Sequence, residues 1–101
     1  MGEEPISRHY WSQRLKLHYA VWGDEANPPL LLIHGNRDHA RTWDQVAVRL
    51  KERFCVYAVD LRGHGKSTGR RIYFGLRETR DLSQLLDVLG REAQVVRARS
   101  L

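Results

Sequence analysis

The hydrophobic positions of the first half of the chain form short runs separated by turn-forming residues. Two aromatic-rich segments of alternating character, His9–Trp11 and Lys16–Trp22, predict strands that pair as an antiparallel hairpin. The turn formers and prolines of residues 23–29 end the second strand. Leu30–Ile33 and Phe54–Val59 are apolar without alternation, which is typical of strands covered on both faces of a parallel sheet.

Two later segments place their apolar residues at helical spacing. The first predicts a helix over residues 43–53, with one apolar face made by Trp43, Val46, Ala47 and Leu50. The second predicts a helix over residues 79–89, built on Leu82, Leu85, Leu86 and Leu89. Gly90 then stands where a left-handed C-terminal residue is expected. Val95-Val96 predicts the opening of a further strand.

The order of these elements predicts the fold class. Strands near residues 30–34 and 54–60 flank the first helix as a βαβ unit, whose crossover is right-handed and whose strands are parallel. The sequence therefore predicts an α/β fold, with an antiparallel hairpin followed by parallel βαβ units and flanking helices. We expect one domain over residues 1–101, with a modest core, because a chain of this size buries only about two thirds of its unfolded surface.

Composition narrows the class of protein. Hydrophobic residues make up 42% and charged residues 29% of the chain, which is the balance of a globular protein and excludes overall disorder. The longest apolar stretch, Leu30–Ile33, is too short to cross a membrane, and the acidic start Met1–Glu4 does not suit a secretory signal. These features predict a cytoplasmic protein without a membrane partner. The single cysteine, Cys55, is expected to be a core side chain.

Residues that can carry chemistry follow directly after the two continuous apolar strands. His34-Gly35-Asn36 follows the first, and Asp60-Leu61-Arg62-Gly63-His64-Gly65-Lys66-Ser67 follows the second. The carboxyl ends of parallel strands meet at one edge of a sheet, where open α/β folds place their ligands. We therefore expect these two segments to lie together at a ligand-binding edge.

These motifs resemble those of the α/β-hydrolase family. Residues 60–67 are similar to the family's Asp-x-Arg-Gly-His-Gly-x-Ser segment after the fourth strand, and the His-Gly turn is similar to the one after the third strand. The resemblance covers residues 14–67 well and residues 82–96 loosely. It implies a partial α/β-hydrolase sheet, no cofactor, and hydrolysis of an ester, lactone, epoxide or similar small-molecule substrate.

The resemblance also implies roles for single residues. Gly35 and Asn36 correspond to the oxyanion and substrate-binding positions, with the Asn36 backbone N–H as the oxyanion donor. Ser100 occupies the position of the nucleophile, although this chain reads Ala98-Arg99-Ser100-Leu101 where the family has Gly-x-Ser-x-Gly. The remaining motif residues correspond to scaffold positions: His34, Asp60, Arg62, Gly63, His64, Gly65 and Ser67.

The catalytic acid and base of the family follow the serine in chain order, and this sequence has no residue after Leu101. We therefore expect an incomplete hydrolase domain, ending at the nucleophile elbow, that is inactive on its own. An unpaired edge of such a sheet predicts self-association. The histidines show no ligand spacing such as His-x-x-x-His, so no metal is expected.

Two alternatives to a hydrolase remain. The net charge of +5 lies in residues 62–101, where nine Lys/Arg oppose four Asp/Glu, and clustered arginines are typical of a basic nucleic-acid-binding module. No recognised binding motif accompanies the arginines, and a solvated basic face accounts for them, so a nucleic-acid partner is not expected. The other alternative is a non-functional fragment of a hydrolase gene.

Overall fold

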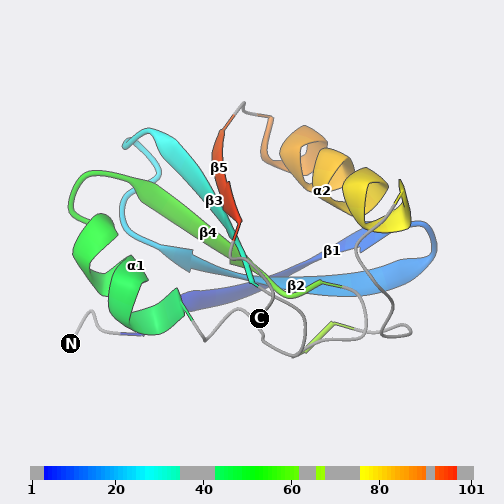
Figure 1. The fold of residues 1–101 in the computed structure, drawn as a ribbon, viewed down its shortest axis with the longest axis horizontal. Coiled ribbons are helices and arrows are strands. Elements are labelled where there is room, and N and C mark those ends of the chain that lie inside the picture. The colour runs from blue at the N-terminus through cyan, green and yellow to red at the C-terminus, as the bar shows by residue number, and fades with distance from the viewer. Residues whose placement is uncertain (1–3, 35–42, 62–65, 68–75, 91–92, 98–101) are drawn as a thin grey trace.

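The computed structural model describes residues 4–34, 43–61, 66–67, 76–90 and 93–97 (Figure 1). Its strands and helices, in chain order, are β1 (Ile6–Ser12), β2 (Leu15–Trp22), β3 (Pro29–Ile33), α1 (Asp44–Leu50), β4 (Cys55–Val59), α2 (Leu76–Leu89) and β5 (Gln94–Arg97). Within these ranges no helix is long and apolar enough to cross a membrane.

The strands form one mixed sheet in the order β1-β2-β4-β3-β5. β1 and β2 pair as the predicted antiparallel hairpin, and β2 is also antiparallel to β4. β3 lies between β4 and β5 and is parallel to both. The predicted α/β class, a hairpin followed by parallel βαβ units, is therefore confirmed.

Two separate apolar clusters cover the two faces of the sheet, and Figure 1 shows α1 and α2 on opposite sides of it. Along β4, Tyr57 packs in the α2-side cluster with Leu85, whereas Val56 and Ala58 pack in the α1-side cluster with Ala47. Both faces of β3 and β4 are buried, which explains why their sequences are apolar without alternation. Cys55 is fully buried as a free thiol, as expected.

The hairpin connecting β1 and β2 turns in two residues, Gln13 and Arg14. Both have positive φ, 48° and 71°, as a type I′ turn requires. The turn lies against α2, because Ser12 Oγ and Gln13 Nε2 both donate to Asp81 Oδ1, over 2.7 and 2.9 Å. Asp81 is 2% exposed, so this contact fixes the tip of the hairpin to the buried side of the helix.

Both helices differ from their predicted bounds. α1 ends at Leu50, and the chain then turns, with the N–H groups of Arg53 and Phe54 both donating to the Leu50 carbonyl. α2 begins at Leu76, three residues earlier than the leucine spacing predicts, because its first turn lacks that spacing. Gly90 ends α2 with φ of 66° and donates to the Leu86 carbonyl, as predicted.

Gly23 ends β2 where the chain passes the connection between α1 and β4. Its φ is 91°, and a Cβ atom at this position would lie 2.6 Å from the carbonyl oxygen of Phe54 and 2.8 Å from that of Lys51. Glycine is therefore required here both by the backbone conformation and by the lack of space.

Candidate functional site

The two motif-bearing strands deliver their following residues to the same edge of the sheet. The ends of β3 and β4 are directly paired, Ile33 with Val59. His34 and Asp60 follow at once and are almost fully buried, at 1% and 3% exposure. The expected meeting of the two segments at the carboxyl edge of the parallel strands is thus found for the residues that the structure describes.

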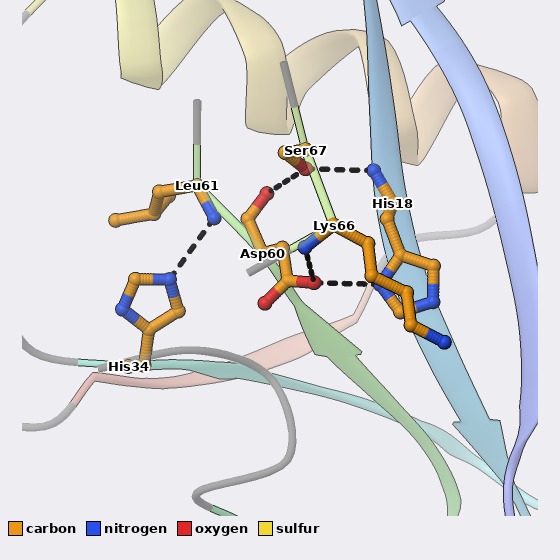
Figure 2. A network of polar contacts seen from close by, with 6 residues as sticks. All are labelled: His18, His34, Asp60, Leu61, Lys66 and Ser67. Atoms are coloured by element: carbon orange, nitrogen blue, oxygen red, sulfur yellow. Dashed lines mark hydrogen bonds and ion pairs between the residues drawn. The ribbon is translucent and has the colours of Figure 1, made fainter. Parts of the chain in front are cut away.

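His34 connects the segment after β3 to the segment after β4. Its Nε2 accepts a hydrogen bond from the backbone N–H of Leu61 over 3.0 Å (Figure 2). An acceptor nitrogen is unprotonated, so the proton of the neutral ring is on Nδ1. The Nε2 lone pair of His34 is therefore already used within the protein, which disfavours His34 as a general base through that atom.

Asp60 is the centre of a buried polar network (Figure 2). Its Oδ2 accepts the backbone N–H of Lys66 over 3.0 Å and lies 2.7 Å from Nδ1 of His18. Its backbone N–H donates to the carbonyl of His18 over 2.9 Å. The carboxylate thus holds the chain after β4 against the middle of β2.

Ser67 closes this network with its hydroxyl. Ser67 Oγ donates to the Asp60 carbonyl over 2.6 Å and accepts the backbone N–H of His18 over 2.7 Å. Just where β4 ends, the hydroxyl makes the backbone hydrogen bonds that a neighbouring strand would otherwise make. The Ser67 side chain is buried. Because its proton and one lone pair are engaged by the backbone, Ser67 is a structural hydroxyl in this arrangement.

His18 was not among the sequence-predicted site residues, although it is central to the network. It lies within an alternating strand and belongs to no motif. The β2–β4 register places it beside Asp60, and this register pairs Tyr19 with Val59. Only a prediction of that long-range antiparallel register would have identified His18.

His9 lies opposite His18 on β1, with 5.1 Å between the two ring centroids. The pKa of His9 is lowered from its ordinary value of 6.5, first by partial desolvation and then by the electrostatic effect of His18, Lys16 and Lys66, with Asp60 opposing the shift. His9 is exposed on the edge strand, whereas His18 is 1% exposed.

The predicted site residues divide into two groups. His34, Asp60 and Ser67 are brought together at the sheet edge as described above. The others lie outside the described residues: Gly35, Asn36, Arg62, Gly63, His64, Gly65 and Ser100. Among the described residues, no group of three or more His, Cys, Asp or Glu side chains is placed to hold a metal ion.

Comparison with known proteins gives the family. The Alpha/beta hydrolase family matches residues 30–98, about two thirds of the chain, including all but the first residue of β3, the whole of β4 and both motif segments. The chain belongs to the α/β-hydrolase family.

Relatives of this hydrolase-family chain include a serine hydrolase-like protein of Mus musculus, 44% identical over 48 residues, which cover 48% of the chain and 15% of the relative. A monoacylglycerol lipase of Mycolicibacterium smegmatis is 36% identical over 76 residues, which cover 72% of the chain and 25% of the lipase. Among solved structures, an epoxide hydrolase of Vigna radiata matches with a TM-score of 0.85 and 28% identity, covering 96% of the chain and 31% of that structure. The chain thus spans a quarter or less of these two curated relatives.

Proposed function

We propose that this chain contributes the oxyanion side of a hydrolase active site that acts on an ester, lactone, epoxide or similar small molecule. The observation that carries this proposal is the hydrogen bond from Leu61 N–H to His34 Nε2. It joins the starts of the two motif segments at the carboxyl edge of β3 and β4, where α/β folds place their ligands. The names of the relatives, a lipase among them and an epoxide hydrolase among the structures, support the substrate class.

The proposed chemistry begins at the turn after β3. Gly35 and Asn36 directly follow His34, and the backbone N–H of Asn36 is the proposed donor to the oxyanion. A rigid donor aimed at developing negative charge stabilises a transition state more than the ground state. In this proposal His34 is a positioning residue: its hydrogen bond to Leu61 holds the start of the turn, and it takes no proton from substrate.

Ser100 is the proposed nucleophile by its position in the family pattern. A serine hydroxyl needs an adjacent base, and in this family the acid and the base follow the serine in chain order. We therefore propose that the 101 residues alone do not turn over substrate efficiently, and that hydrolysis needs the further sequence that the longer relatives possess.

We also propose that a second copy of the chain pairs with β5. This strand is at one end of the sheet, and Val95 and Val96 are each about half exposed. A strand edge with unpaired backbone groups and apolar side chains is a template for pairing with another strand. Size-exclusion chromatography over a range of concentrations would detect the dimer, and replacement of Val95 by lysine should abolish it.

The decisive experiment for the proposed function is hydrolysis of a short-chain aryl ester by the purified chain, with Ser100→Ala as the matched control. We expect no turnover above that control. The same assay on a protein in which these residues are followed by the remaining length of a relative should show turnover that Ser100→Ala abolishes. Activity that survives Ser100→Ala in the longer protein would contradict the assignment of the nucleophile.

A further inference from the structure

Two histidine side chains face each other across the first two strands of the sheet. His9 pairs with His18, and their ring planes are tilted by 55° with centroids 5.1 Å apart. The backbone N–H and C=O of His18 bond to Ser67 and Asp60, on the side of β2 away from β1. His9 and His18 therefore form a non-hydrogen-bonded antiparallel pair, the kind in which opposed side chains approach most closely.

Asp60 determines which nitrogen of His18 is available. Its Oδ2 accepts the N–H of Lys66, so this oxygen also acts as the acceptor toward Nδ1 of His18. The proton is then on Nδ1, and the neutral ring presents its lone pair at Nε2. Nε2 is buried and has no hydrogen-bond partner among the described residues. A carboxylate behind a histidine in this way orients the ring and increases its basicity as a metal ligand.

The distance between the two ring centroids is compatible with a single tetrahedral ion bound to one nitrogen of each ring. A Zn–N bond is about 2.0–2.1 Å, and a ring nitrogen lies about 1.2 Å from its ring centroid, so two imidazoles at a tetrahedral angle place their centroids about 5.2 Å apart. The separation of the His9 and His18 centroids is 5.1 Å. An ion bound at Nε2 of His18 would give this buried nitrogen a partner.

We propose that His9 and His18 together bind a divalent transition-metal ion, Zn²⁺ or Cu²⁺, with Asp60 as the outer carboxylate and water in the remaining positions. The site uses two imidazoles because no third His, Cys, Asp or Glu is gathered with them in the described part of the chain. Since Asp60 also holds Lys66, the bound ion would stabilise the segment after β4. This inference does not depend on the proposed hydrolase function.

The charges around His9 and His18 limit the affinity of this site for a metal ion. Lys16 and Lys66 are the cations that act on His9, and Asp60 is the anion. Two ammonium groups repel a dication, so this site should bind more weakly than a structural site with four protein ligands. Cu²⁺ should bind more tightly than Zn²⁺, in the general order of divalent ions. Removing one positive charge with Lys16→Gln should increase the affinity several-fold.

The test is calorimetric titration of the purified chain with Zn²⁺ alone and with Cu²⁺ alone, alongside ¹⁵N NMR of the histidine rings in the Zn²⁺ titration. We expect one ion per chain, a shift of the His18 Nε2 resonance, and at least a roughly tenfold loss of affinity in His9→Gln. His9 is exposed on an edge strand, so this variant should keep the fold, which circular dichroism checks. His39→Gln and His64→Gln are the matched controls and should bind as the unaltered chain does.

Four results would overturn the proposal. One is equal affinity in His9→Gln, and another is loss of binding in His39→Gln or His64→Gln instead. The third is absence of binding at millimolar Zn²⁺ and Cu²⁺. Binding of inorganic phosphate that is lost in Lys16→Gln, with no metal binding, would identify an anion site here and would equally overturn it.

Discussion

His18 and Asp60 are 42 positions apart in the sequence, yet Nδ1 of one lies 2.7 Å from Oδ2 of the other inside the sheet edge. This contact joins the antiparallel hairpin to the parallel part of the sheet. Both side chains are at least 97% buried, so neither can exchange its partner for water. The pair therefore makes the position of the chain after β4 depend on β2.

Replacing Asp60 by asparagine tests this dependence. The amide adds an N–H where the network needs only acceptors, so we expect Asp60→Asn to lower the free energy of unfolding by about 1.5–3 kcal/mol, as for a lost hydrogen bond to a buried charged group. Urea unfolding followed by circular dichroism measures the change. Glu25→Gln is the control, because the Arg8–Glu25 ion pair is on the surface and should contribute less than about 1 kcal/mol. Similar losses in both variants would mean that the buried network has no special role.

The contrast between Gly23 and Gly90 gives a second prediction. Both residues have positive φ, but an added Cβ at Gly23 meets two carbonyl oxygens, whereas at Gly90 it meets nothing within 4 Å. Gly90→Ala should lower the free energy of unfolding by about 1 kcal/mol, because it adds only the strain of the left-handed backbone. Gly23→Ala adds the same strain and also a clash with the backbone, so it should lower the free energy of unfolding by about 2–4 kcal/mol in total. Thermal and urea unfolding of the two variants side by side measure the difference. Equal losses would show that strain alone determines both.

The apolar strands and the motif-bearing edge could be predicted from the sequence, because each is set by local signals. Leu30–Ile33 and Phe54–Val59 are continuous apolar runs that predict strands. The end of each run therefore predicts that the residues after it lie at the edge of the sheet. The partnership of His18 with Asp60 could not be predicted, because it depends on the register between β2 and β4 and leaves no local signal. The start of α2 was also missed, since its first turn carries no apolar spacing.

The hairpin turn is a further case in which local residue choice gives little information. Gln13 and Arg14 both adopt positive φ, although neither is a glycine or asparagine. The Gln13 side chain offsets part of this strain by donating to Asp81 Oδ1 over 2.9 Å. The turn is therefore held by a tertiary contact with α2.

Arg14→Gly is expected to stabilise the protein, because Arg14 has a positive φ. Glycine adopts φ near 71° without steric cost, and we expect the free energy of unfolding to rise by about 0.5–1 kcal/mol after the larger entropy loss of glycine. Gln13→Gly removes strain as well but loses the bond to Asp81, so it should give no net gain. Urea unfolding of the two variants tests the difference, and a larger gain from Gln13→Gly would show that the Asp81 contact contributes nothing.

The His34–Leu61 hydrogen bond makes a prediction at a single amide. In His34→Ala the buried N–H of Leu61 loses its acceptor, which should cost about 1–3 kcal/mol, while His34→Gln keeps a carbonyl oxygen on its side chain and should recover part of that loss. Hydrogen exchange measured by NMR is the local readout. The Leu61 amide should exchange faster in His34→Ala relative to the amide of Asp60, which donates to the His18 carbonyl and keeps its partner. If the exchange rates of both amides increase equally, the substitution has loosened the whole edge of the sheet. His34 could then not be assigned the specific role of holding the turn after β3.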